Sequence, residues 1–169
     1  MTSALPAWLA AACVLLPAVA HAQAPVETYA FQLEQGTDRC TVSYPRSDGE
    51  TLSFLLLKDG TFNASVFKPE WESLVDGKDD SKQDDHVVLD LDDAGKTTSQ
   101  WGGYENGFNQ GVWAAWDPGQ PSDDALALLK TATKASIVFE GTNLGTFDMK
   151  QKGMAAILLS TCVKNLGNS

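Results

Sequence analysis

The side chain best suited to act as a base near pH 7 is histidine, and beyond residue 22 the sequence has one, His86. Nucleophilic catalysis needs such a base within hydrogen-bond reach of an attacking serine or cysteine, and a third group to orient it. No serine stands in the Gly-x-Ser-x-Gly pattern of a nucleophile elbow. His86 itself stands between an acidic stretch and an apolar run, which is typical of a strand edge. The sequence therefore predicts no catalytic residue, and we lean against an enzyme.

A short acidic motif between Asp90 and Gly95 has the first half of a calcium loop, with acids at loop positions 1 and 3 and glycine at position 6. Position 5 is Ala94, and position 12, where a bidentate glutamate belongs, is Trp101. A tight turn after a strand accounts for the same residues, while weak calcium binding by the crowded acids stays open. Zinc has no cluster of nitrogen and sulfur ligands to use. We therefore predict no metal site and no cofactor.

Acidic residues crowd into one stretch of the chain. Between Asp76 and Asp93 lie eight aspartates against Lys78 and Lys82, a net of −6 within a formal charge of −10. A field of this sign repels phosphate groups, so we expect no nucleic-acid partner, whereas a basic protein is favoured. The alternative is a solvated loop that keeps the protein soluble. The candidate contact residues are Asp79, Asp80, Asp84 and Asp85.

Two aromatic segments form the second set of candidate binding residues: Trp101, Tyr104, Trp113 and Trp116. Tryptophans exposed beside glycines form platforms for sugars or anchors for a protein partner. Large aromatic residues on strands are more often core, and the odd spacing of Trp113 and Trp116 places them on opposite faces. An enzyme acting on polysaccharide would also need two carboxylates, for which Glu70 and Glu72 are the least arbitrary pair.

The rest of the chain reads mostly as short strands separated by turn residues. Cys40, Val42 and Tyr44 alternate with polar residues, which puts Cys40 on the inward face of a strand. Asp59-Gly60 is the strongest hairpin sequence in the chain. Further strands are expected at residues 29–33, 52–57, 61–67, 86–91, 97–104, 111–116, 137–139 and 146–149.

Two segments near the C-terminus have helical periodicity instead. Ser122 is the expected N-cap of the first helix, with acids behind it that suit the helix dipole. The second helix is expected from about Gly153 to Leu166. Met154, Leu158 and Cys162 recur at four-residue intervals on its predicted buried face. The sequence therefore predicts a mainly β fold with two helices, an antiparallel β-sandwich or curled sheet closed by a C-terminal helix.

Residues 1–22 contain no lysine, arginine, aspartate or glutamate, and their apolar run ends in Ala20-His21-Ala22. This layout is typical of a signal peptide cleaved after Ala22, and the run is too short for a convincing membrane span. We therefore expect one domain, residues 23–169, in the periplasm or outside the cell.

Beyond the predicted signal peptide the sequence has two cysteines, Cys40 and Cys162. In an oxidising compartment such an isolated pair is most simply a disulfide, and two free buried thiols are the alternative. A bridge between them would pin the terminal helix onto the sheet.

One C-terminal segment resembles a known family. Thr146-Phe147-Asp148-Met149, followed by Lys152-Gly153-Met154-Ala155-Ala156 and an apolar helix, is similar to the end of invasion-associated locus B-type proteins. These are small exported β-sandwich proteins of Gram-negative bacteria. That family carries tryptophan and paired cysteines near its N-terminus, whereas here Cys40 stands without tryptophan. The resemblance implies a periplasmic, non-catalytic β-sandwich and assigns no functional residue.

Together these features favour an exported, non-catalytic binding or inhibitor-type module that recognises a basic protein partner in the periplasm. The alternative is a cell-wall or polysaccharide-active enzyme, or a glycan-binding domain, that uses the two aromatic segments. A structural component of the cell envelope is a third interpretation, which the sequence does not separate from the first.

Overall fold

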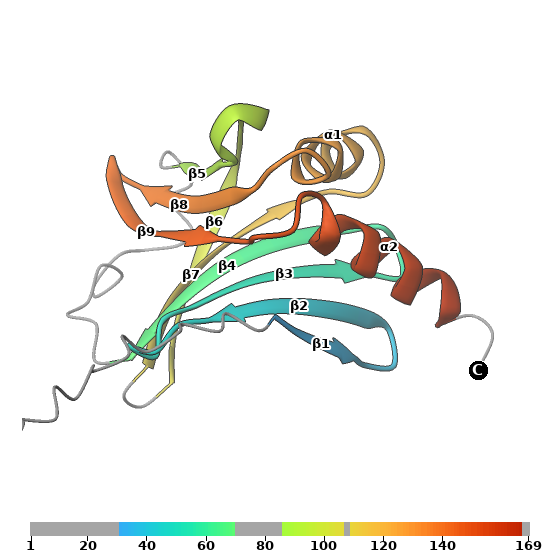
Figure 1. Ribbon diagram of the computed structural model, residues 1–169, viewed down its shortest axis with the longest axis horizontal. Coiled ribbons are helices and arrows are strands. Elements are labelled where there is room, and N and C mark those ends of the chain that lie inside the picture. The colour runs from blue at the N-terminus through green and yellow to red at the C-terminus, as the bar shows by residue number, and fades with distance from the viewer. Residues whose placement is uncertain (1–30, 70–85, 107–108, 167–169) are drawn as a thin grey trace, which may run out of the picture.

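The computed structural model describes residues 31–69, 86–106 and 109–166, and of residues 86, 100, 101, 104–106 and 109 it describes the backbone alone. Within these ranges the chain is mainly β with two α-helices, as predicted (Figure 1). The strands are β1 (Gln32–Gln35), β2 (Arg39–Pro45), β3 (Thr51–Leu57), β4 (Phe62–Pro69), β5 (His86–Asp90), β6 (Lys96–Asn106), β7 (Asn109–Trp116), β8 (Lys134–Phe139) and β9 (Thr142–Asp148). The helical segments are the short 3-10 helix η1 (Asp92–Ala94), α1 (Gln120–Leu129) and α2 (Met154–Asn165).

The strands form an antiparallel sheet in the order β1-β2-β3-β4-β7-β6-β5-β8-β9. β6 is the longest strand, with 11 residues, and it belongs to both halves of the sheet. Its first part pairs with β5, and its second part, from Trp101 onward, pairs with β7. The sheet curls over at this strand, which brings β8 and β9 across from β2 and β3 (Figure 1). β1 and β9 remain the two edges of the sheet.

The first half of the sheet has one apolar face. In β2, Cys40, Val42 and Tyr44 are buried and the residues between them are half-exposed, as the two-residue period of a strand requires. The alternation continues in β3, β4 and β7, because their register keeps equivalent residues opposite one another. The buried side chains of these three strands include Leu52, Phe54, Leu56, Phe62, Ala64, Val66, Val112, Ala114 and Trp116.

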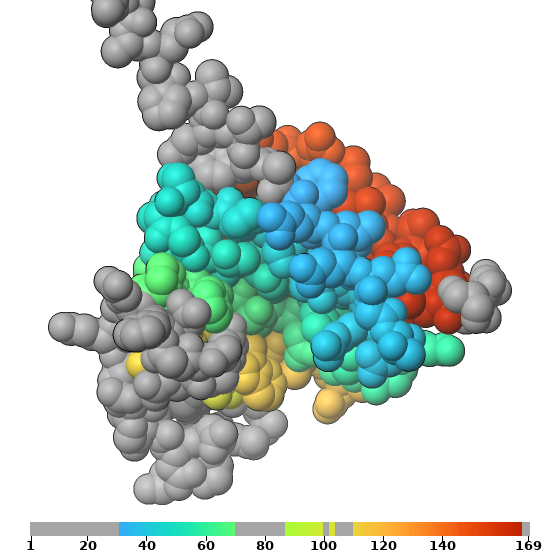
Figure 2. Space-filling model, turned by 90° about the horizontal axis from the view of Figure 1, so that it is seen from below, coloured from blue at the N-terminus to red at the C-terminus, as the bar shows by residue number. Residues whose placement is uncertain are grey.

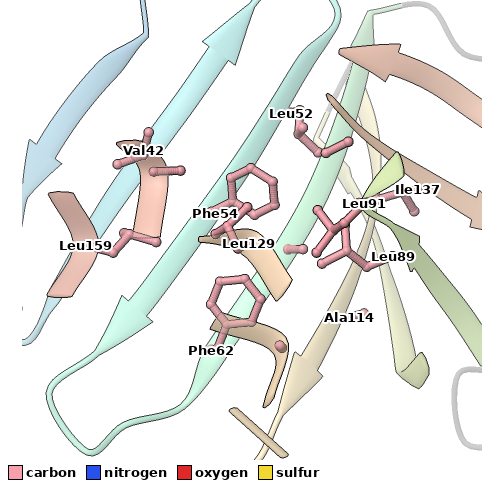
Figure 3. Close-up of a cluster of buried hydrophobic side chains, with 14 of the residues drawn as sticks. Val42, Leu52, Phe54, Phe62, Leu89, Leu91, Ala114, Leu129, Ile137 and Leu159 are labelled. Atoms are coloured by element: carbon pink, nitrogen blue, oxygen red, sulfur yellow. The ribbon is translucent and has the colours of Figure 1, made fainter. Parts of the chain in front are cut away.

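The hydrophobic core fills the space inside the curl (Figure 3). Phe54 and Phe62 of the first half stack with their ring centroids 6.1 Å apart and their planes 13° from parallel. Leu89 of β5, Leu129 of α1 and Leu159 of α2 belong to the same cluster of buried side chains (Figure 3). Each such fully buried side chain stabilises the fold by about 1.5–3 kcal/mol relative to an exposed one. One core therefore joins both halves of the sheet and both helices.

The start of α1 differs from the sequence prediction. The helix begins at Gln120, with Gly119 before it and Pro121 in its first turn. Proline suits this turn because its missing N–H would have no intrahelical partner there. Ser122 is therefore not the N-cap: it lies inside the helix, and its side chain is buried. α1 packs on β4 and β7 and against α2.

α2 lies over β2 and β3, as a closing helix should, but its buried stripe differs from the predicted one. The helix buries Ala155, Ala156, Leu159 and Cys162, whereas Met154 and Leu158 are only half-buried. With 3.6 residues per turn, a series spaced strictly by four drifts about 40° at each step. A series with steps of four and three stays on one face, so the buried stripe runs through Ala155, Leu159 and Cys162.

A glycine sets the junction between the two helices. Gly153 precedes α2 with a φ of 72°, in the left-handed region that favours glycine. A Cβ at this position would overlap the carbonyl group of Lys130, the residue that follows α1. The close approach of the two helices therefore depends on glycine at this position.

The tight hairpins follow the turn chemistry of their sequences. In the β3–β4 turn, Gly60 has a φ of 95° and the Asp59 carboxylate accepts a 2.8 Å hydrogen bond from the N–H of Thr61. The β8–β9 turn consists of Glu140 and Gly141, both with positive φ, and Phe139 pairs with Thr142 across it. Positive φ at both central residues is typical of the type I′ hairpin, whose twist matches that of the strands.

Cys40 and Cys162 form the predicted disulfide. It joins β2 to α2 across 122 residues of sequence, with the two Cα atoms 6.1 Å apart. Both cysteines are buried, so the bridge is part of the core rather than a surface clip. None of the helices in the described part of the chain is long and apolar enough to span a membrane.

We predict that replacing both cysteines by alanine lowers the free energy of unfolding by about 2–5 kcal/mol, because the bridge constrains a long loop of the unfolded chain. Urea denaturation of the oxidised protein and of the Cys40→Ala/Cys162→Ala variant measures this difference. Reduction of the native protein should lower the stability to a similar extent. Equal midpoints for all three samples would show that α2 needs no covalent anchor.

Candidate functional site

The four aspartates predicted to contact a partner lie outside the described residues. Asp79, Asp80, Asp84 and Asp85 belong to the segment between Pro69, the last residue of β4, and His86, the first of β5. Their role as binding residues stays a prediction.

The first aromatic segment is described only in its backbone. Trp101 pairs with Ala114 and Tyr104 pairs with Gly111, both between β6 and β7. The two aromatic segments therefore lie on paired strands. The side chains of Trp101 and Tyr104 lie outside the described part, and their role stays a prediction.

The second aromatic segment divides between the two faces of the sheet, as its odd spacing predicts. Trp116 is 3% exposed, its indole N–H donates a 3.0 Å hydrogen bond to the Thr97 hydroxyl, and its ring lies 5.4 Å from that of Phe62. Trp116 is a core residue, which removes it from the candidate binding residues. Trp113 is 38% exposed on the outer face.

Trp113 lies over a glycine on the outer face of the first half of the sheet. Gly102 is its partner in β6, and a Cβ at Gly102 would overlap the indole ring. On the other side, Ser65 pairs with Trp113, and the register continues through Ser53 to Ser43. The hydroxyls of Ser43 and Ser53 are hydrogen-bonded at 2.8 Å. The indole ring of Trp113 thus lies at one end of a row of three serine side chains. Figure 2 shows the face on which β1, β2 and β3 lie.

The acidic motif after β5 forms a tight turn. Asp92, Asp93 and Ala94 make up η1, and the Leu91 N–H donates to the Gly95 carbonyl at 2.9 Å to close the turn. Asp90 pairs with Lys96 across the β5–β6 turn at 2.6 Å. Among the residues that the structure describes, no three acids, histidines or cysteines are grouped so that they could hold a metal ion.

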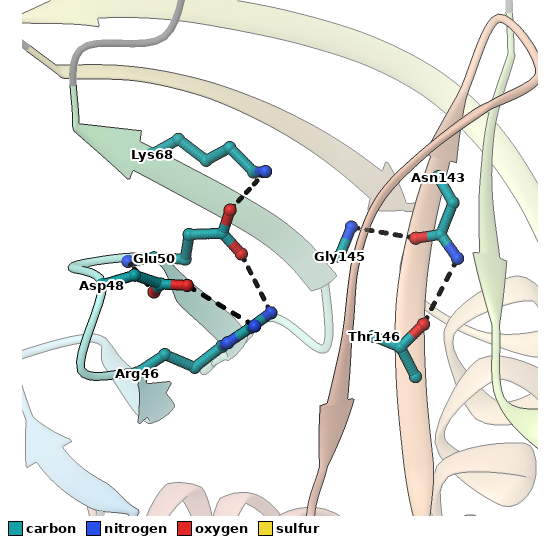
Figure 4. A network of polar contacts seen from close by, with 7 residues as sticks. All are labelled: Arg46, Asp48, Glu50, Lys68, Asn143, Gly145 and Thr146. Carbon is teal, nitrogen blue, oxygen red and sulfur yellow. Dashed lines mark hydrogen bonds and ion pairs between the residues drawn. The ribbon is translucent and has the colours of Figure 1, made fainter.

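A network of charged side chains occupies the β2–β3 turn and the end of β4 (Figure 4). Arg46 donates to Glu50 at 3.0 Å and forms an ion pair with Asp48 at 3.4 Å, and Lys68 forms an ion pair with Glu50. The guanidinium carbon of Arg46 also lies 5.3 Å from the centre of the Phe147 ring of β9, within the range of a cation–π contact. Two carboxylates and one aromatic face therefore hold Arg46 in place.

This network brings the β2–β3 turn up against β9, where the curled sheet comes closest to closing. A Cβ at Gly145 of β9 would lie 3.0 Å from the Glu50 carboxylate. Gly145 has a φ of 126°, and its N–H donates a 2.9 Å hydrogen bond to the side chain of Asn143. Asn143 in turn donates to the Thr146 hydroxyl at 3.3 Å (Figure 4). Gly145 thus leaves room for the charged turn, while Asn143 and Thr146 are bonded to each other.

A hollow of about 210 Å³ lies at this meeting point, lined by Tyr44, Arg46, Thr146, Phe147 and Asp148. Tyr44 is 3% exposed, and its hydroxyl oxygen is buried with no hydrogen-bond partner among the described residues. Burial raises the pKa of Tyr44 to about 12, so the phenol stays protonated at physiological pH. Buried hydroxyls are normally hydrogen-bonded, so an unpartnered one at a hollow marks a place for a ligand or water.

None of the residues that line this hollow stands out in the sequence as functional. The alternation of Cys40, Val42 and Tyr44 predicts that Tyr44 faces inward, but no sequence pattern connects it with β9. Phe147 and Asp148 stand in the predicted strand 146–149 and in the segment that carries the resemblance, neither of which assigns them a function. The spacing of about a hundred residues between the two sides could not be inferred from periodicity, because it depends on how far the sheet curls.

Comparison with known proteins yields no relative. No protein-family model, no curated protein sequence and no solved structure matches the chain.

We predict that Tyr44 makes the protein sensitive to alkali. Its folded-state pKa of about 12 exceeds the ordinary value of about 10, so the unfolded state loses the proton first. The stabilisation is present in full below pH 10 and is lost as the pH rises towards 12, by about 2–3 kcal/mol at most. Denaturation between pH 8 and 12 should show a smaller loss in Tyr44→Phe than in the native protein. Parallel curves for the two proteins would contradict this assignment.

We also predict that Gly102→Ala displaces the ring of Trp113 without unfolding the sheet. The backbone at Gly102 does not require glycine, but the added methyl group occupies the space of the indole. Fluorescence quenching by acrylamide, compared with that of Trp113→Phe, should show a more accessible Trp113 in the alanine variant. An unchanged quenching curve would mean that Trp113 does not lie over Gly102 in solution.

Proposed function

We propose that this protein is an exported, non-catalytic binding module that recognises a basic protein partner through its acidic segment, residues 70–85. The observation that carries the proposal is how this segment is attached. Its ends are held by β4 and β5, which are separated in the sheet by β7 and β6. Both strands contribute buried residues to the core. The acidic segment therefore connects two strands of the same sheet.

The distribution of charge supports this choice of partner. The acidic segment contains seven acids and two lysines, a net of −5, which is half of the formal charge of −10. The described residues carry 14 acids and 10 bases over a much larger surface. Concentrated charge of one sign accelerates encounter with a partner of the opposite sign and selects against acidic partners.

The charged side chains near the hollow favour binding over catalysis. The ion pairs of Arg46 with Asp48 and Glu50 are local to one turn and fasten it against β9. Their role is to hold the scaffold. The C-terminal strand–glycine–helix segment adds to the proposal through its resemblance to invasion-associated locus B-type proteins, which implies a non-catalytic protein of the periplasm.

A glycan-binding surface is the second candidate function, and the outer face of the sheet favours it. Trp113 is exposed above Gly102 at the end of the row formed by Ser43, Ser53 and Ser65. Flat aromatic rings beside hydroxyl groups suit the apolar face and the hydroxyls of a sugar. If the outer face binds glycan, Trp113→Ala should retain less glycan than the native protein while its fold is unchanged.

We predict that neutralising Asp79, Asp80, Asp84 and Asp85 to asparagine weakens binding to a basic probe protein, lysozyme, at least about tenfold at low ionic strength. It should also flatten the salt dependence, since the screening length falls to about 10 Å at 0.1 M salt. Calorimetric titration of oxidised protein at several salt concentrations measures both effects.

The matched control removes four exposed acids elsewhere: Glu34→Gln, Asp38→Asn, Asp117→Asn and Asp123→Asn. It changes the net charge by the same amount and should retain most of the affinity. Equal weakening in both variants would show that net charge alone causes the loss of affinity. Unchanged binding in the variant of the acidic segment would exclude that segment as the recognition surface.

A further inference from the structure

The hollow between the β2–β3 turn and β9 has the features of a built site rather than a packing gap. Tyr44 reaches it from the buried face of β2, and Thr146, Phe147 and Asp148 line it from β9. Figure 4 shows the β2–β3 turn, with Arg46, beside β9, whose Thr146 is hydrogen-bonded to Asn143. The hydroxyl of Tyr44 is the polar atom there that no described residue satisfies.

The Tyr44 hydroxyl requires a partner that can both donate and accept. A neutral phenol offers one donor and also accepts, and burial keeps it neutral at physiological pH. Leaving such a group buried without a partner costs about 1–3 kcal/mol. A hydroxyl group of a ligand meets both requirements, whereas an ammonium group only donates and a phosphate or carboxylate oxygen only accepts.

The charges around the hollow are already balanced, which argues against an ionic ligand. Arg46 and Lys68 are paired with Asp48 and Glu50, so the network attracts neither sign strongly. A cation would also meet the guanidinium of Arg46, which already contacts the Phe147 ring. Asp148 is the remaining charged side chain of the lining, and one of its oxygens accepts from the N–H of Lys150 at 2.8 Å. Its second oxygen can accept from a hydroxyl group.

The size and the lining of the hollow define the ligand further. Its volume of about 210 Å³ is below the roughly 300–1,000 Å³ of pockets for drug-sized ligands. One small ring fits, and an extended chain does not. The wall combines one aromatic ring, Phe147, with hydroxyl, carboxylate and guanidinium groups that can fix the hydroxyls of such a ring.

We propose that this hollow binds an uncharged, hydroxyl-rich ring the size of one sugar residue, with the Tyr44 hydroxyl and the Asp148 carboxylate as its main hydrogen-bonding partners. The site draws on other residues than Trp113 on the outer face. It belongs to the described part of the chain, so its test does not depend on the proposed protein partner.

The test is a nuclear magnetic resonance titration of the isotope-labelled, oxidised protein, following the backbone amides of residues 44, 46 and 146–148. The neutral probes are glucose and N-acetylglucosamine. Nα-acetyl-lysine amide, which keeps its side-chain ammonium group, represents cationic ligands, and inorganic phosphate represents anionic ones. We expect saturable shifts of these amides with at least one neutral probe, and none with the two charged probes.

Two isosteric variants locate the binding. Tyr44→Phe and Thr146→Val each remove one hydroxyl group while preserving shape, and Tyr44→Phe should weaken the sugar about three- to tenfold, the loss of one hydrogen bond. Thr146→Val provides a second measurement if the first variant is unstable. Ser53→Ala, on the outer face, is the matched control and should bind as the native protein does.

Several results would overturn the proposal. Saturation by the lysine amide or by phosphate alone would assign the hollow to an ionic ligand. Shifts with a sugar that survive in Tyr44→Phe and vanish in Trp113→Ala would move the site to the outer face. The absence of saturable shifts with all four probes would leave water as the occupant of the hollow.

Discussion

The packing of α2 onto β2 and β3 is the interaction on which the rest of the structure depends. A sheet with one apolar face is stable only when that face is covered, and α2 covers β2 and β3, near the β1 edge of the first half. Ala155 and Ala156 let the helix approach closely, and Cys162 bonds to Cys40 of β2. The last helix is thereby fixed to the second strand, and the curled sheet between them encloses one core.

The long strand β6 explains how the sheet produces a site at its open edge. Because β6 pairs with β7 along one part and with β5 along the other, the two halves turn towards each other. The last strand, β9, then meets the β2–β3 turn, where Arg46 contacts Phe147 and Gly145 leaves room for Glu50. Neither backbone hydrogen bonds nor apolar packing close this junction completely. Charged pairs close part of it, and the hollow beneath Tyr44 is what remains.

The structure separates three surfaces with different chemistry. The acidic segment joins β4 to β5, the outer face presents Trp113 over Gly102, and the hollow lies between the β2–β3 turn and β9. The three surfaces therefore draw on different residues.

The sequence by itself determined the local structure: the alternation of Cys40, Val42 and Tyr44, the Asp59-Gly60 turn and the opposite faces of Trp113 and Trp116. These follow from the period of a strand and from turn chemistry, which act over a few residues. It also indicated the disulfide, because the chain beyond residue 22 has two cysteines, which leave one pairing. Only the tertiary structure decided the rotation of α2, the start of α1 at Gln120 and the hollow at Tyr44. Each of these depends on contacts between segments far apart in the chain. The curl of the sheet sets those contacts, and local periodicity carries no information about the curl.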